Sequence, residues 1–216
     1  MGDIGSTDGV RMNKKDYRKI TNEFVVPHSS AKHAKLSREA YAVGALARFN
    51  LNSEKLHPKA KEVAAAMRMK PKCINPYFNT VAQLVESVHC LEDAISVVEN
   101  LKSTSLNYEE EIVVGLNEQH KIPVRAGSGV GAVEVPRGIL FHNYQTDENG
   151  LITNANCVIP TNQNTGNIEY DMMKLIPEIL DRSDNEITLA IEMLVRSYDP
   201  CISCSAHLLK IKFVNK

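Results

Sequence analysis

Three residues near the end of the chain have the types and spacing of metal ligands. Cys201, Cys204 and His207 follow one another at steps of three, in the stretch Asp-Pro-Cys-Ile-Ser-Cys-Ser-Ala-His. Thiolate and imidazole groups that are this close in sequence converge readily on one soft or borderline metal ion. The pattern predicts a metal centre, and the spacing alone leaves the identity of the metal open.

Other readings of the same residues remain open at this point. A thioredoxin-like redox pair would open a helix within a βαβ unit, which the surrounding sequence does not provide. A zinc site would take Cys201, Cys204 and His207 as three of its ligands, yet no second Cys-x-x-Cys completes the set. Haem attachment would need a histidine directly after Cys204, where Ser205 stands instead. Two buried, inert cysteines are the remaining alternative.

A second group of residues lies upstream, in Glu134-Val135-Pro136-Arg137-Gly138. An arginine in an apolar neighbourhood needs an acceptor, because an unpaired buried charge is costly. Asp199, beside the cysteines, is the candidate partner for Arg137. The alternative is an exposed arginine or a surface ion pair of little energetic weight.

Composition limits the class of protein. The chain has 216 residues and a net charge of −1, so it is long enough for a sizeable core and lacks the basic excess of a nucleic-acid binder. No apolar run approaches the length of a membrane span, and the first residues lack the apolar segment of a secretory signal. Five cysteines in such a chain favour thiols or metal ligands over disulfides. We therefore expect a cytoplasmic protein.

Apolar periodicity and cap residues predict a mostly helical α+β fold. The expected helices cover residues 40–49, 58–66, 76–102, 166–181 and 183–198. Two strands, at 139–144 and 151–158, are joined by the turn signal Asp147-Glu148-Asn149-Gly150 and give a small antiparallel element near 137–158. We expect the longest helix to pack beside the last two, and residues 1–16 to be loosely structured.

Three further expectations concern particular positions. Gly127, Gly129 and Gly131 form a Gly-x-Gly-x-Gly run that is only a weak signal for a phosphate loop, because no strand–glycine–helix unit surrounds it. Cys90, within the longest helix, is expected in the core. The last helix should deliver the two metal-ligand cysteines to a loop in the protein interior.

These residues together resemble the large, catalytic subunit of nickel–iron hydrogenases. Asp199-Pro200-Cys201-x-x-Cys204-x-x-His207 is similar to that family's C-terminal signature. Two other signatures stand upstream in the family's order, the glycine run through Arg137-Gly138 and Val158-Ile159-Pro160-Thr161-x-x-Asn164. The stretches His28–Lys32 and Gly44–Arg48 look like the cytosolic, multimeric group. The resemblance covers nearly the whole chain from about residue 8.

The resemblance implies a role for each matching residue. Cys201 would bind nickel terminally, and Cys204 would bridge nickel to an iron that carries carbon monoxide and cyanide. Arg137 would lie over the cluster, oriented by Asp199. Thr161 would offer its hydroxyl to a cyanide, while Pro136 and Pro160 shape a dry pocket. His207 would bind a structural magnesium. The implied reaction is the reversible oxidation of H2 to protons and electrons.

One departure from the family is as informative as the match. The family's second cysteine pair, in an Arg-x-Cys-Gly-x-Cys motif, has no counterpart here, because Cys73 and Cys90 have neither that spacing nor the flanking glycine. We therefore expect a single unit, residues 1–216, that corresponds to the C-terminal half of a large subunit and supplies half of the ligands. The alternatives are a non-catalytic remnant or assembly module, or a zinc-binding domain that uses Cys201, Cys204 and His207.

The resemblance also implies partners and processing. Electrons would leave through an iron–sulfur small subunit, and another chain or fragment would bring the missing cysteine pair. Family large subunits carry a short extension after the histidine, which a maturation endopeptidase removes once nickel is in place. Leu208 to Lys216 would be that extension, or else a permanent edge strand.

Overall fold

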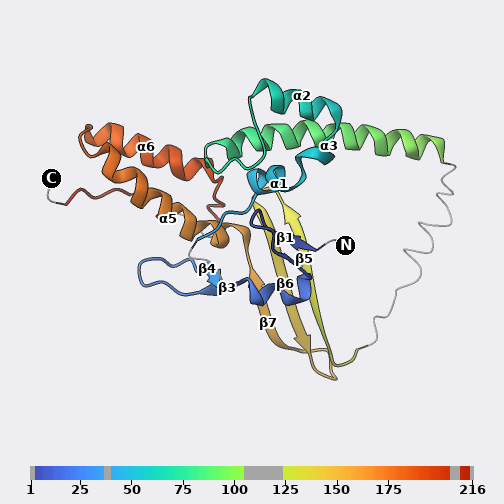
Figure 1. The fold of residues 1–216 in the computed structure, drawn as a ribbon. Coiled ribbons are helices and arrows are strands. Elements are labelled where there is room, and N and C mark those ends of the chain that lie inside the picture. Colours follow the sequence, from blue (N-terminus) through green and yellow to red (C-terminus); the bar gives the residue numbers. More distant parts are fainter. Residues whose placement is uncertain (1–2, 37–39, 105–123, 205–209, 215–216) are drawn as a thin grey trace.

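The structure is a computed structural model and describes residues 3–36, 40–104, 124–204 and 210–214. Helices make up most of the regular structure and all strand pairs are antiparallel, so the chain has the α+β fold that the sequence predicts. In Figure 1, a three-stranded sheet extends away from two groups of helices that meet near one of its ends.

The α-helices of the described residues are α1 (Ala45–Asn52), α2 (Pro58–Ala66), α3 (Phe78–Ser103), α5 (Pro160–Ile179) and α6 (Asp184–Ser197), with short 3-10 helices at η1 (Lys14–Lys19) and η2 (Ser53–Lys55). Pro58 occupies the first turn of α2, where its missing N–H has no partner to lose. Ser183 and Glu186 form the predicted capping box of α6, each accepting a hydrogen bond from the other's backbone N–H. The helices expected at 58–66, 76–102 and 183–198 are therefore confirmed to within about two residues, the usual uncertainty of helix ends.

Two helices begin elsewhere than expected. Helix α1 starts at Ala45, because Gly44 has a positive φ of 120° that a helix does not accommodate. Helix α5 starts at Pro160 rather than near residue 166. Its first turn consists of polar residues, which hides it from a search for apolar periodicity.

The main sheet has the order β5–β6–β7, formed by β5 (Gly127–Val135), β6 (Gly138–Thr146) and β7 (Ile152–Val158). The predicted hairpin is present, and Asp147 Oδ1 accepts hydrogen bonds from the N–H groups of Asn149 and Leu151, each at 2.9 Å. The glycine run lies within strand β5, so the phosphate-loop reading is wrong. The sheet gains this third strand beyond the two expected.

The first part of the chain is more ordered than expected. Strands β1 (Ile4–Gly5) and β2 (Arg11–Met12) pair with each other, and β3 (Thr21–Phe24) pairs with β4 (His33–Leu36). Tyr17 of η1 is fully buried and stacks on Phe141 of β6, with ring centroids 4.7 Å apart. This contact fixes the N-terminal segment against the sheet.

Helix α3 packs mainly on α1 and α2, through a core cluster that includes Phe49, Ala82 and Val85. Its described contact with α6 lies near its first turn, so the expectation that the long helix packs beside the last two is largely wrong. Several apolar side chains along α3 are exposed, namely Leu84, Leu91, Ile95, Val97, Val98 and Leu101. Cys90 is exposed as well, contrary to the expectation of a core position.

Helices α5 and α6 form a separate pair, held by apolar clusters that include Ile168, Ile179 and Leu194. Within the ranges that the structure describes, no helix combines the length and hydropathy needed to cross a bilayer. The two groups of helices and the sheet converge around the turn that follows α6.

Candidate metal centre

The chain leaves α6 through a turn that is fixed by buried hydrogen bonds. Asn79 of α3 donates from Nδ2 to the carbonyl oxygen of Ser197 at 2.9 Å, and its Oδ1 accepts from the N–H of Leu46 at 3.1 Å. One amide side chain therefore joins the start of α1 to the end of α6. Asp199 then takes a left-handed conformation, with φ of 48°, before Pro200. Aspartate tolerates this conformation better than most residues do.

Arg137, in the turn between β5 and β6, meets Asp199 as predicted. Its Nε donates to the backbone oxygen of Asp199 at 2.7 Å, and a terminal nitrogen lies 3.2 Å from the carboxylate Oδ1. Gln83 of α3 donates to the other carboxylate oxygen at 3.0 Å. The two side chains are 40% and 36% exposed, so this pair is open to solvent in the described chain rather than enclosed in a dry pocket.

The two cysteines follow directly. The N–H of Cys201 donates to Thr161 Oγ1 at 3.2 Å, which ties the cysteine loop to the first turn of α5. The sulfur atoms of Cys201 and Cys204 are in contact as a disulfide. Cys201 is half-buried and Cys204 is exposed, so the expected interior loop is in fact at the surface. Both sulfurs lie where a bound group could reach them.

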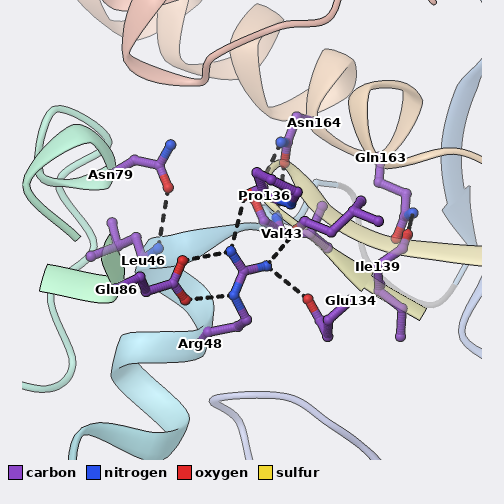
Figure 2. Close-up of polar contacts among 11 residues, drawn as sticks. Val43, Leu46, Arg48, Asn79, Glu86, Glu134, Pro136, Ile139, Gln163 and Asn164 are labelled. Carbon is purple, nitrogen blue, oxygen red and sulfur yellow. Dashed lines mark hydrogen bonds and ion pairs between the residues drawn. The ribbon is translucent and has the colours of Figure 1, made fainter. Parts of the chain in front are cut away.

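The first turn of α5 supports this arrangement with buried polar side chains. Gln163 donates to the carbonyl oxygen of Ile139 at 2.6 Å, and Asn164 forms two hydrogen bonds with the backbone of Val43, at 2.8 and 3.2 Å (Figure 2). Asn162 donates to the carboxylate of Glu23 at 2.7 Å. Partners so distant in sequence hold Pro160 and Thr161 in place, because buried polar groups must be satisfied.

Arg48 of α1 is the strongest polar link between the helices and the sheet. Figure 2 shows its guanidinium between Glu86 of α3 and the end of β5. Two of its nitrogens donate to the two oxygens of Glu86, at 2.6 and 2.8 Å. Further bonds reach Glu134 at 2.7 Å and the carbonyl oxygens of Val135 and Pro136, each at 2.9 Å. All five N–H donors of the side chain are thereby used.

The five acceptors around Arg48, here called the Arg48 cage, determine the pKa of its guanidinium. Burial by itself would lower the pKa of the guanidinium, but hydrogen bonds and charges from Glu86 and Glu134 raise it overall. The group is therefore a permanent cation that fixes the backbone immediately before Arg137.

Close packing explains the glycine that follows Arg137. Gly138 has a φ of 139°, and a Cβ atom there would lie 2.3 Å from Cγ2 of Val43 and 3.3 Å from Cβ of Pro160. Only glycine allows this approach. Pro160 is half-buried against the same turn, whereas Pro136 is exposed.

The structure thus brings together most residues singled out from the sequence: Arg137, Pro160, Thr161, Asp199, Cys201 and Cys204. His207 lies outside the described residues. Sequence reasoning missed Asn79, Gln83 and the structural role of Arg48. The signal available for Asn79 and Gln83 was their spacing: two polar residues four apart in the apolar pattern of α3 lie on one face of the helix.

Comparison with known proteins identifies the family. The family model described as nickel-dependent hydrogenase matches residues 11–207. The chain belongs to the nickel-dependent hydrogenase family. The alpha subunit of sulfhydrogenase 1 from Pyrococcus furiosus is 32% identical over 208 residues, which cover 96% of this chain and 46% of that relative. The beta subunit of the NAD-reducing hydrogenase HoxS from Cupriavidus necator is 32% identical over 173 residues, which cover 77% and 34%.

Solved structures agree with this assignment. A NAD+-reducing [NiFe]-hydrogenase in the H2-reduced state aligns with a TM-score of 0.65 and 25% identity, over 93% of this chain and 45% of that one. A [NiFeSe] hydrogenase variant from Desulfovibrio vulgaris Hildenborough shares the fold, with a TM-score of 0.53 at 15% identity. The chain therefore spans less than half the length of these hydrogenase relatives.

Proposed function

We propose that this chain is the C-terminal part of a nickel–iron hydrogenase large subunit and supplies Cys201 and Cys204 to the metal centre. The observation that carries the proposal is the convergence of the cysteine pair, Arg137–Asp199 and Thr161 at one turn, in a chain of the nickel-dependent hydrogenase family. The expected setting is a cytoplasmic complex.

The donor set fits the group. Cys201 and Cys204 lie in one turn with Cα atoms 5.3 Å apart, and thiolates are the soft ligands that suit nickel and iron. A metal-bound sulfur must be a thiolate, so binding requires the reduced pair. The exposure of Cys204 leaves room for a second pair of ligands, which would come from the complementary part of the large subunit.

When bound, the nickel–iron centre, with its carbon monoxide and cyanide ligands, supplies the reversible splitting of H2 into protons and electrons. In the reduced chain, the Sγ atom of Cys201 would take up the proton at the edge of the site. Arg137 would be the alternative acceptor; Asp199 orients it, and Gln83 in turn holds the Asp199 carboxylate.

Thr161 has a second use for its hydroxyl group. Its Oγ1 accepts the N–H of Cys201, and a threonine hydroxyl that accepts one bond still has its own O–H to donate. We assign that donor to a cyanide ligand of the centre, with Pro136 and Pro160 shaping the surroundings. His207 would hold a structural magnesium.

The remaining partners follow from the proposed reaction. An iron–sulfur small subunit would carry electrons away, because iron–sulfur clusters need further cysteine ligands. The complementary chain would also cover the open side of Arg137 and Asp199. Desolvation there would strengthen their ion pair by lowering the local dielectric.

The decisive experiment uses the complex assembled with the complementary part and the small subunit. Cys204→Ser should abolish stoichiometric nickel and H2-dependent dye reduction, whereas Cys90→Ser should leave both unchanged, because Cys90 lies exposed on α3 away from the turn. Nickel and activity that survive in Cys204→Ser would refute the proposal. Stoichiometric zinc without nickel in the wild-type complex would favour a zinc-binding domain, and a stable complex without metal would favour an assembly module.

The C-terminal segment has its own test. Ile211 packs against the cluster of Ile179, Ile187 and Ile191 on the α5–α6 pair, and residues 210–214 form no strand. We propose that residues 208–216 are a maturation extension that an endopeptidase removes after nickel insertion. Intact mass of the chain from active complex should show a C-terminus near His207. A C-terminus at Lys216 in active enzyme would exclude the cleavage.

A further inference from the structure

A second group of metal-ligating side chains lies between the β3–β4 hairpin and α5. His28 lies in the loop between β3 and β4, His33 begins β4, and Glu169 belongs to α5. Their candidate ligand atoms all lie within 4.8 Å of one another. Among the described residues this is the one set of three or more histidine, cysteine or acidic groups with such spacing.

The geometry is close to that of a bound ion. Nε2 of His28 lies 2.7 Å and Nε2 of His33 lies 3.6 Å from the same oxygen of Glu169. Ligands at about 2.0–2.2 Å from zinc are separated from each other by about 3.3 Å in a tetrahedron. To reach that separation from the Glu169 oxygen, His28 would move outwards by about 0.6 Å and His33 inwards by about 0.3 Å, roughly the amplitude of ordinary side-chain motion.

One ligand of the site, His33, is buried and held in place, whereas the other two, His28 and Glu169, are exposed. His33 is 5% exposed, and its ring is held edge-on by Phe24, at 6.1 Å, and by His28, at 5.6 Å. Burial lowers the pKa of His33, partly opposed by the charge of Glu169, which favours the neutral imidazole that a metal requires. His28 and Glu169 are accessible from solvent, so an ion has a route of entry.

An ordinary ion pair accounts for only part of this arrangement. His28 and Glu169 form a good hydrogen bond, but the 3.6 Å between His33 and Glu169 is too long for one. A cation between the three groups would engage all of them, and the carboxylate would balance part of its charge.

We propose that His28, His33 and Glu169 bind a divalent transition-metal ion, for which Zn²⁺ is the best match. Two imidazoles and one carboxylate are a ligand set that zinc accepts, with a fourth position left to water. The ion would clip the β3–β4 hairpin to α5 and so brace the helix whose first turn holds Thr161. This site is independent of the proposed nickel–iron centre.

The test uses the full 216-residue chain carrying Cys201→Ser and Cys204→Ser, so that thiols at the turn do not bind the probe. After chelator treatment, Zn²⁺ is titrated by calorimetry. One equivalent should bind and raise Tm. Removal of a direct ligand in His28→Ala or Glu169→Gln should weaken binding by more than the factor of about 10–100 typical of outer-shell partners.

His57→Ala is the matched control, because the ring of His57 also contacts that of another histidine, His89, at 4.8 Å between centroids, but lies outside the three-residue set. It should leave the affinity unchanged. Both test variants alter exposed side chains and should fold, which far-ultraviolet circular dichroism checks. Equal Zn²⁺ affinity in the background, His28→Ala and Glu169→Gln would overturn the proposal.

A Co²⁺ spectrum gives a second readout in the chain with its cysteines intact. Cobalt at the histidine site should give d–d bands that carry no thiolate charge-transfer absorption and that persist when Cys201 and Cys204 are replaced by serine. Glu169→Gln should remove these bands. If all Co²⁺ absorption disappears with the cysteines, metal binding belongs to the turn alone and the histidine site is refuted.

Discussion

Arg48 allows the sharpest quantitative test of how the site is held. It joins α1 to α3 through Glu86 and to the end of β5 through Glu134 and two carbonyl oxygens. The side chains of Arg48, Glu86 and Glu134 are 19%, 25% and 52% exposed. The two carboxylates therefore contact one guanidinium but differ in burial and in number of bonds.

The expected magnitudes follow from that difference. Arg48→Ala leaves Glu86 mostly buried without its partner. We therefore expect the free energy of unfolding to fall by about 2–4 kcal/mol, somewhat less than for fully buried pairs. The pairwise coupling of Arg48 with Glu86 should be about 1.5–3 kcal/mol, as for charged hydrogen bonds. The coupling with the more exposed Glu134 should be below about 1 kcal/mol. Arg48→Lys keeps the charge but has three donors in place of five, and should lie between wild type and Arg48→Ala.

Urea unfolding followed by far-ultraviolet circular dichroism measures these values, since the chain contains no tryptophan. Double-mutant cycles with Glu86→Gln and Glu134→Gln give the two couplings, provided that the m-value stays constant. Equal couplings for the two glutamates would refute the burial argument. A loss below about 0.5 kcal/mol for Arg48→Ala would show that the cage contributes no more than an ordinary surface pair.

Three further predictions concern the turn and its supports. Arg137→Lys loses the planar fork and should lower turnover of the assembled complex at least about tenfold while changing Tm little; unchanged turnover would remove Arg137 from the mechanism. Gly138→Ala places a methyl group against Val43 at a positive φ, so a loss of about 2–4 kcal/mol is expected in urea unfolding, and a neutral result would contradict the close packing. Ser183→Ala removes the N-cap of α6 and should lower the free energy of unfolding in urea by about 1 kcal/mol. Ser87→Ala, on the exposed side of α3, should lower it much less.

Local signals in the sequence predicted the elements that local physics determines. The proline at the start of α2, the capping box of α6 and the Asp-Glu-Asn-Gly turn each act over a few residues, and each is found where expected. The contact of Arg137 with Asp199 was also predicted, but its premise of a buried charge that needs a partner does not hold in the described chain, where the two side chains are 40% and 36% exposed.

Long-range interactions account for what was missed. The first turn of α5 is buried although it is polar, because Glu23, Val43 and Ile139 satisfy its side chains from more than 20 residues away. A helical turn made of polar residues has no apolar periodicity from which it could be predicted. Strand β5 was missed because its glycines give no alternating pattern, and its pairing with β6 determines its conformation. The surface location of Cys204 depends on what packs around the turn, which periodicity does not encode.

The uneven burial of α3 has a consequence for the motions of the chain. All buried residues of this helix, Asn79, Ala82 and Val85, lie in its first third, and the helix runs out beyond α1 and α2 in Figure 1. Its 26 residues span about 39 Å at 1.5 Å per residue. From Leu91 onwards, the side-chain contacts with other elements are the surface ion pairs of Glu92 with Lys59 and of Asp93 with His57. The helix there depends mainly on its own backbone bonds, which are only marginally stable in water.

Amide protons along α3 should therefore exchange with solvent at graded rates, slowly near Val85 and fast beyond Leu91. A partner that covers the exposed apolar side chains would slow exchange in the second part and leave the first part unchanged. Ordering that part costs conformational entropy when the partner binds. One helix thus joins a packed end beside the cysteine turn to a distal end that such a partner would order.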